Sequence, residues 1–228
     1  MENEVKQLII EFEQKLASND AEIITDLKKL LVALDNLPEK SQKDSIMQIA
    51  SMIESFAYEA YNGTFYYELV YMNRYARLVF FHFPYNEKAA IVLLHTTRGL
   101  LELKINREDK DNMEIYQKDI EFIWEHFQTN TEIAYKCMAC FALLQVSCLS
   151  QDRNITSFPI YFVERNVDNM EAISSRFPND ESINKLYNRS LSDISYELRN
   201  HPNKDISNKF IHLLINQIIT RNIGILTP

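Results

Sequence analysis

The most regular feature of the sequence is a helical period of apolar residues that runs along nearly its whole length. In the first segment the apolar side chains recur every three or four residues, at Val5, Leu8, Ile9, Phe12 and Leu16. This spacing places them on one face of an α-helix and predicts a helix over about residues 3–18. The same period predicts about nine further helices, over about 23–34, 41–62, 64–81, 85–105, 111–127 and 132–149, and from starts near 157, 178 and 202.

Polar residues before the apolar segments indicate where several helices begin. Two pairs resemble capping boxes: Asn19 with Glu22, and Thr129 with Glu132. Ser41 is predicted to cap the third helix, because a serine side chain can accept a hydrogen bond from the first helical turn. These signals predict short connections between successive helices.

One segment has the composition of a β-strand. Residues 78–83 read LVFFHF, which is rich in residues that favour strands. The segment lies at the end of a periodic helix and has no convincing partner strand. We therefore interpret it as the buried end of the fourth helix, which begins after a stop at Asn62-Gly63. The predicted fold class is all-α.

The helices can be paired into hairpins that start near residues 3, 41, 85, 131 and 179. Successive starts are about 38 to 48 residues apart, and in this spacing the chain resembles HEAT and armadillo repeats, whose period is about 40–47 residues. The resemblance implies an α-α superhelix of stacked hairpins, and a compact orthogonal helical bundle is the alternative. No linker-like stretch divides the sequence, so residues 1–228 are expected to form a single domain.

Composition narrows the classes of function. The formal net charge is −8, and residues 1–60 carry 6 basic and 12 acidic side chains. Nucleic-acid binding is therefore disfavoured, because it depends on a basic face. Only 3 glycines occur, which excludes most nucleotide folds that need glycine-rich loops. We see no signal peptide and no apolar stretch long enough to span a membrane, and with 3 cysteines we expect a cytoplasmic protein.

Cys137 and Cys140 form a Cys-x-x-Cys pair, with Cys148 eleven residues after the first. Such pairs occur in redox and zinc sites. Zinc would need a second ligand pair and a redox motif a preceding strand, whereas this pair lies in a predicted helix. We interpret the three cysteines as small core residues.

The remaining polar residues show no catalytic pattern. The five histidines are scattered, and His95 is expected to bond a nearby hydroxyl or a backbone carbonyl. The acidic cluster over residues 108–114 is interpreted as a solvated helix start, where negative charge favours the helix dipole. We predict no catalytic residue, no metal and no cofactor, so the motifs weigh against an enzyme without excluding one.

The strongest functional lead is an aromatic block over residues 56–85, which holds 12 Phe and Tyr side chains. Within it, Tyr67, Tyr71 and Arg74 share one helical face, and Arg77 lies close to that face. Tyr and Arg are enriched at binding hot spots. The same residues could instead fill space in the core, and the pattern alone favours packing slightly over recognition.

These observations favour a non-catalytic protein that binds another protein or a peptide, as an adaptor or as an immunity-type inhibitor. The expected binding residues are Tyr67, Tyr71, Arg74 and Arg77. One alternative is a small-molecule-binding protein or enzyme with an aromatic-lined pocket around residues 64–81. A HEAT-like nucleic-acid-binding protein is a further alternative, which the net charge disfavours. Self-association through the aromatic face also stays open.

Overall fold

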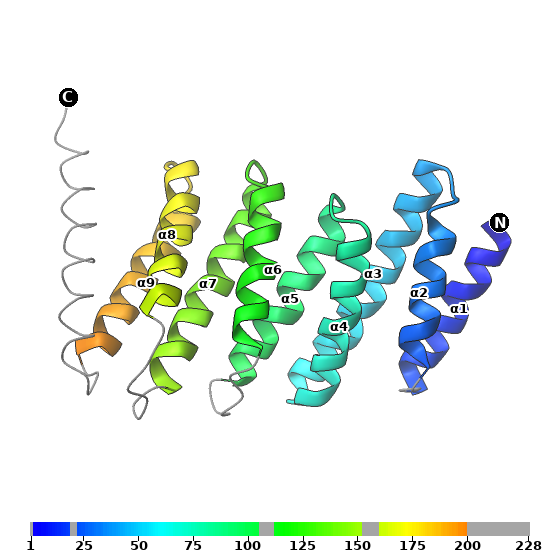
Figure 1. Cartoon of the computed structure of the whole chain (residues 1–228), viewed down its shortest axis with the longest axis horizontal. Helices are drawn as coiled ribbons and strands as arrows, with labels where there is room; N and C mark the ends of the chain where they lie inside the picture. Colours follow the sequence, from blue (N-terminus) through cyan, green and yellow to red (C-terminus); the bar gives the residue numbers. More distant parts are fainter. Residues whose placement is uncertain (1, 19–21, 105–111, 152–159, 200–228) are drawn as a thin grey trace. The chain divides into compact units, whose positions relative to one another are not determined.

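The computed structural model describes residues 2–18, 22–104, 112–151 and 160–199. Every regular element in these ranges is an α-helix, so the described part of the chain is all-α, as the apolar period predicts (Figure 1). The helices are α1 Glu2–Ser18, α2 Ile23–Leu34, α3 Glu39–Asn62, α4 Tyr66–His82, α5 Glu87–Lys104, α6 Met113–His126, α7 Thr131–Gln151, α8 Ile160–Arg176 and α9 Glu181–Arg199.

The predicted helix ranges agree with these bounds to within a few residues, but two predicted caps are wrong. Asn130, rather than Thr129, caps α7, because its Oδ1 accepts a hydrogen bond from the Ile133 amide at 3.0 Å. Ser41 lies inside the first turn of α3, which begins after Pro38. Proline suits a helix start because it has no amide hydrogen to leave unpaired. The expected cap Asn19, the start near residue 157 and the tenth helix from residue 202 lie outside the described residues.

The turn between α3 and α4 has an unusual backbone. α3 ends at Asn62, as the Asn-Gly pair predicts, but Gly63 has an ordinary φ of −78°. The left-handed residue is Thr64, with a φ of 57°. The ring of Phe65 folds back over Gly63, where an added Cβ would lie 2.4 Å from a ring carbon. Gly63 is therefore needed because the Phe65 ring packs directly against its backbone, where a side chain would collide with the ring. The strained backbone conformation of the turn is at Thr64.

The strand candidate is helical, as predicted. It forms the last turns of α4, in which Val79 and Phe80 are buried. Phe81 and His82 are exposed, so only part of the segment is the buried helix end that the sequence suggested. Its aromatic residues therefore divide between the core and the surface.

By the contacts among its residues the chain divides into two compact units. Unit 1 comprises Met1–Leu103 with Glu125–Phe127, and unit 2 comprises Lys104–Trp124 with Gln128–Pro228. Each unit is described separately below.

In unit 1 two helical hairpins pack side by side. α1 pairs with α2 and α3 with α4, while α1 also contacts α3 and α2 contacts α4 (Figure 1). α5 joins them through a buried polar clamp, in which Asn73 of α4 donates hydrogen bonds of 3.0 Å to the hydroxyls of Thr96 and Thr97. The apolar stripes meet in one core, whose most deeply buried members include Phe12, Leu27, Leu30, Leu34, Ile49, Ile53 and Phe80.

In unit 2, α7 packs against α8 and α9, which also contact each other. A buried chain of amides crosses its core. Gln117 donates to Asn166 at 3.0 Å, Asn166 donates to Gln145 at 3.1 Å, and Gln145 donates to the carbonyl of Val163 at 3.3 Å. Because buried polar groups cost free energy unless they are bonded, this chain fixes the register of the helices that supply it.

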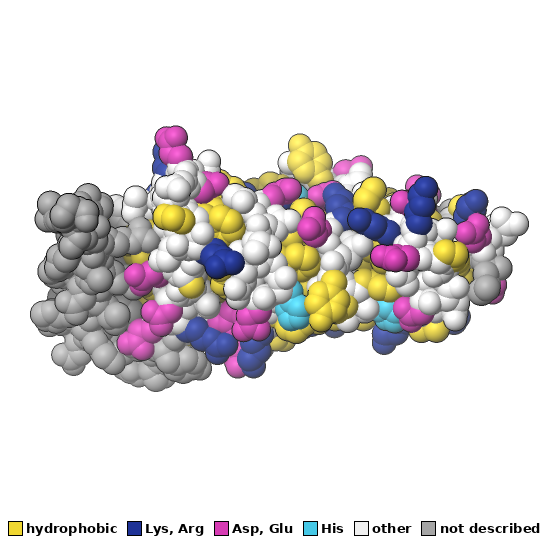
Figure 2. All heavy atoms as spheres, turned by 90° about the horizontal axis from the view of Figure 1, so that it is seen from above, with side chains coloured by type: hydrophobic (Ala, Val, Ile, Leu, Met, Phe, Trp, Pro, Cys, Tyr) yellow, Lys and Arg dark blue, Asp and Glu magenta, His cyan; other side chains and the backbone are white. Residues whose placement is uncertain are grey.

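The surface of the helix ends carries mixed charge. Figure 2 shows Lys and Arg side chains interspersed with Asp and Glu side chains, with hydrophobic side chains exposed between them. No large patch of a single sign is visible among the described residues on this face.

Candidate functional site

The outer face of α4 carries the predicted binding residues. Tyr67 is 71% exposed and Tyr71 39% exposed, and Arg74 is exposed one turn further along the helix. Arg77 is half-buried, and its guanidinium lies 5.3 Å from the centre of the Phe81 ring. Three of the four residues therefore lie on the surface of this face, and the fourth lies at its edge.

The aromatic block divides between core and surface. Tyr66, Tyr75 and Phe80 are buried, and the Tyr75 ring meets Phe12 edge-on at 6.5 Å. Burial raises the pKa of Tyr75 above its ordinary value, and nearby Tyr71 adds to the effect. Seven members are exposed instead: Tyr58, Tyr61, Phe65, Tyr67, Tyr71, Phe81 and Tyr85. Fewer than half of the twelve aromatic residues in the block are therefore packed inside the protein, although the sequence pattern slightly favoured packing.

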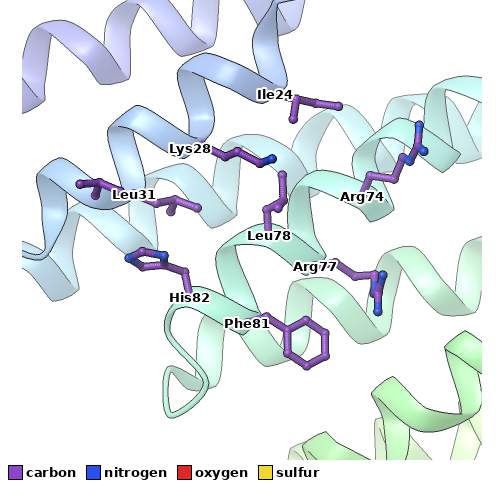
Figure 3. A pocket seen from close by; sticks show the side chains of 9 residues that line it. Ile24, Lys28, Leu31, Arg74, Arg77, Leu78, Phe81 and His82 are labelled. Carbon is purple, nitrogen blue, oxygen red and sulfur yellow. The ribbon is translucent and has the colours of Figure 1, made fainter.

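A groove of about 670 Å³ lies between α2 and α4, and we call it the α2/α4 groove. Figure 3 shows side chains from the two helices facing it, with Lys28 and Leu78 pointing toward one another. Its lining consists of Ile24, Lys28, Leu31 and Val32 from α2 and Arg74, Arg77, Leu78, Phe81 and His82 from α4. The groove thus includes two of the four predicted binding residues.

The lining of this groove is basic and apolar. No Asp or Glu is among the described residues that line it. In the part of the chain that the structure describes, neither Lys28 nor Arg74 takes part in an ion pair. At the end of the groove, His82 Nε2 lies 2.9 Å from the nearer carboxylate oxygen of Asp35. Positive charge is therefore concentrated in this groove of an acidic chain.

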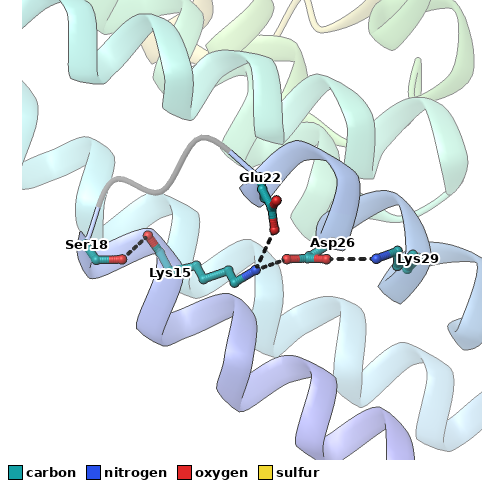
Figure 4. A network of polar contacts seen from close by, with 5 residues as sticks. All are labelled: Lys15, Ser18, Glu22, Asp26 and Lys29. Carbon is teal, nitrogen blue, oxygen red and sulfur yellow. Dashed lines mark hydrogen bonds and ion pairs between the residues drawn. The ribbon is translucent and has the colours of Figure 1, made fainter.

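The acidic residues at the start of α2 are directed to other partners. Asp26 bonds Lys15 of α1 and lies 3.2 Å from Lys29, and Glu22 lies 3.8 Å from Lys15 (Figure 4). The hydrogen bonds from Lys15 and Lys29 hold the pKa of the Asp26 carboxyl below its ordinary value. This network ties α1 to α2, and it leaves Lys28 outside it.

The sequence did not single out the α2 wall of the groove. Lys28 and Val32 lie more than forty residues before Arg74, and a local period cannot show that two distant helices are neighbours. The one available signal was Val32 itself. Within the predicted second helix it falls outside the stripe of Leu27, Leu30, Leu31 and Leu34, which marks it as an exposed apolar residue.

A second hollow, of about 480 Å³, lies between α3 and α5, with Leu69 of α4 in its lining. Glu54 bonds both Lys88 and His95, with 2.7 Å between His95 Nδ1 and Glu54 Oε1. Burial raises the pKa of Glu54, but the bonds from Lys88 and His95 outweigh it, so the pKa is lowered. One partner of His95 is thus a carboxylate, which the sequence analysis did not name.

At the other end of this hollow, Glu102 accepts hydrogen bonds from Tyr61 at 2.6 Å and Arg98 at 2.8 Å. The bond to Glu102 raises the pKa of Tyr61. Gly99 lies between the two ends, and a Cβ there would approach Leu69 at 3.1 Å. Each carboxylate in this hollow therefore already has cationic or hydroxyl partners within the fold.

The remaining motifs are structural where the structure describes them. Cys137 and Cys140 of α7 are buried and form no disulfide, which confirms their interpretation as core residues. The side chain of Cys148 and most of the acidic cluster at 108–111 lie outside the described residues. Glu114 is in the first turn of α6, 2.8 Å from Lys118. Among the described residues, no group of three His, Cys, Asp or Glu side chains is placed to hold a metal ion.

Within the described ranges, none of the helices combines the length and the apolar character that crossing a membrane requires. Comparison with known proteins found no family model, no curated protein and no solved structure that matches this chain.

Proposed function

We propose that this chain is a non-catalytic binding protein that recognises another protein or a peptide through the outer face of α4. The observation that carries the proposal is the joint exposure of Tyr67, Tyr71 and Arg74 on one helical face. Tyrosine and arginine supply large contact area and directional hydrogen bonds, so they dominate the binding energy of many interfaces. Recognition explains their exposure better than packing does.

The arrangement of unit 1 supports a helical-repeat architecture as part of this proposal. The α1–α2 hairpin packs beside the α3–α4 hairpin with α1 next to α3 and α2 next to α4. Stacks of this kind offer extended surfaces for partner proteins. An adaptor and an immunity-type inhibitor both fit a cytoplasmic protein of this design.

The hollow between α3 and α5 favours a second candidate, a small-molecule-binding protein or enzyme. Tyr58 and Tyr61 are among the residues that line it, and the volume of the hollow is typical of ligand pockets. A thermal-shift panel of metabolites tests it, because a ligand that binds only the folded state raises Tm. Nucleic-acid binding has less support, given the net charge of −8.

The test of the main proposal is a quantitative pull-down from the host lysate with a matched pair of charge-reversal variants. The site variant is Arg74→Glu/Arg77→Glu. The control is Lys40→Glu/Lys43→Glu, which makes the same change of charge at exposed positions near the start of α3. We expect one partner at stoichiometric yield that the site variant loses at least about tenfold, which corresponds to about 1.4 kcal/mol.

Circular dichroism checks that both variants remain helical. A partner that both variants retain would place the binding surface elsewhere, and the acidic helices α1–α3 would be the next surface to test. If no partner is captured and a metabolite stabilises the chain, the second candidate replaces the first.

A further inference from the structure

We infer that the α2/α4 groove seats an acidic amphipathic helix of the partner protein, lying lengthwise between α2 and α4. The inference rests on the function proposed above and deepens it in two ways. It adds Lys28 and Val32 of α2 to the binding site, and it names the chemistry of the bound segment.

The shape of the groove fits a helix. Its α2 wall is built from positions i, i+4, i+7 and i+8, starting at Ile24, and its α4 wall repeats that spacing from Arg74, with Arg77 added at i+3. Each wall therefore runs along its helix for about 12 Å, or two helical turns. An amphipathic helix that packs into such a groove buries one apolar stripe against both walls at once.

The exposed apolar side chains of the groove favour a partner that presents apolar side chains to them. Val32 is 59% exposed and Phe81 42% exposed, and Leu78 lies in the same lining. A bound helix that presents apolar residues three and four positions apart would remove this surface from water, which favours binding. A purely polar ligand would make no apolar contact with these side chains, so it would not gain this contribution to binding.

The positive charges of the groove determine which residues the bound helix should carry on either side of its apolar stripe. Lys28 and Arg74 stand on opposite walls without ion pairs in the described part of the chain. A neutral or basic partner would desolvate these cations without compensation, which costs free energy. Glu or Asp residues on both sides of the apolar stripe would pair with them instead, so the groove discriminates in favour of acidic segments.

A nucleic acid fits these observations less well than a protein segment. A phosphate backbone could meet the cations, but it offers nothing to Val32 and Phe81. Its affinity also depends on many phosphate contacts, and the surrounding chain is acidic overall. The combination of an apolar strip with cations on both walls is the feature that points to a peptide helix.

The experiment is a selection of displayed random peptides, each long enough for about three helical turns, on the purified full chain. Selected peptides are synthesised with a fluorophore. Their Kd is measured by anisotropy for the wild type, Lys28→Glu, Val32→Asp, Arg74→Glu/Arg77→Glu and the control Lys40→Glu. Lys28 and Val32 are exposed, so the variants keep their fold, and circular dichroism verifies this. A labelled single-stranded DNA oligonucleotide and sedimentation of the chain alone complete the set.

We expect the selected peptides to be acidic, with apolar residues at helical spacing. Lys28→Glu should weaken binding about tenfold at low salt, and the loss should shrink as added salt screens the charges. Val32→Asp should also weaken binding, because it removes an apolar contact and adds a like charge, and the part of the loss that comes from the apolar contact should persist at high salt. Lys40→Glu should bind as the wild type does.

Four outcomes would overturn the inference, and the last of them leaves the proposed function standing. The first is that no peptide is selected, or only neutral or basic ones. The second is DNA binding that Lys28→Glu abolishes, and the third is a dimer of the chain that the same substitution dissociates. Peptides that lose affinity for Arg74→Glu/Arg77→Glu but not for Lys28→Glu or Val32→Asp would refute the groove and leave the proposed function standing.

Discussion

At the scale of single residues, the α3–α4 turn stores strain in Thr64. A β-branched residue with a φ of 57° is uncommon, because its Cβ crowds the backbone in the left-handed region. Thr64→Gly should therefore raise the free energy of unfolding by about 1 kcal/mol, or Tm by about 2–4 °C. Thermal and urea unfolding measure both quantities.

The matched control for this prediction is Thr25→Gly in the first turns of α2, where φ is helical. Glycine is a poorer helix former than threonine, so this variant should lose a few tenths of a kcal/mol. If both substitutions lowered stability, the strain at Thr64 would be offset by contacts of its side chain, contrary to our expectation.

Glu54 is the residue for which pH dependence is clearest. Its pKa is lowered in the folded state by Lys88 and His95, so its contribution to stability is fully present above the unfolded pKa and is lost as pH falls through the folded pKa. Glu54→Gln should cost about 1 kcal/mol at pH 7, where the native carboxylate is charged. The difference from wild type should narrow as pH falls below about 4.5.

Urea unfolding from pH 7 to pH 3 measures this difference, with Glu59→Gln as the control at an exposed position of the same helix. The control should stay within about 0.5 kcal/mol of wild type at every pH. A Glu54→Gln deficit that stayed constant down to pH 3 would show that the carboxylate does not stabilise the fold through its charge.

At the scale of helices, the α7 start separates two candidate caps that are adjacent in sequence. Asn130 accepts the hydrogen bond from Ile133, so Asn130→Ala should lower the free energy of unfolding by about 1 kcal/mol. Thr129→Ala should have almost no effect, although Thr129 with Glu132 resembles a capping box. Chemical denaturation of the two variants side by side decides between them.

The caps show what a local pattern can and cannot predict. The apolar period located each described helix, because the stripe that a helix buries is written in its own residues. The exact first residue depends on one hydrogen bond, and two neighbouring polar residues compete for it. The period therefore predicted α7 correctly and its cap wrongly.

The candidate site shows the same division. The spacing of Tyr67, Tyr71 and Arg74 correctly placed them on one face, but it could not say whether that face is exposed. Tyr66 and Tyr67 are adjacent and of one type, yet the first is buried and the second is 71% exposed. Packing of other helices decides this difference, and it also brought Lys28 beside α4.

At the scale of the whole molecule, each unit has its own buried polar contacts within its own core. In unit 2, Asn166 bonds both Gln117 and Gln145. Asn166→Ala should lower the stability of unit 2 by about 2–3 kcal/mol, because the buried side-chain nitrogen of Gln117 and the buried side-chain oxygen of Gln145 both lose their hydrogen bonds to Asn166. Asn188→Ala, at an exposed position of α9, is the control and should be neutral.

Hydrogen exchange read helix by helix measures this effect. Protection in α7, α8 and α9 should fall in the Asn166→Ala protein and stay unchanged in the control. Equal protection in both variants would mean that water or a rearranged amide satisfies Gln117 and Gln145.

The buried thiols of α7 offer a way to measure how often unit 2 opens. Burial, together with the neighbouring Cys140, raises the pKa of the Cys137 thiol, so in the folded unit it is neither accessible nor ionised. An alkylating reagent must then wait for α7 to separate from its neighbours, since the thiolate is the reactive species. The alkylation rate of Cys137, followed by mass spectrometry of its peptide, therefore measures how often α7 opens under native conditions. A loss of about 2 kcal/mol in unit 2 would raise that rate by about thirtyfold.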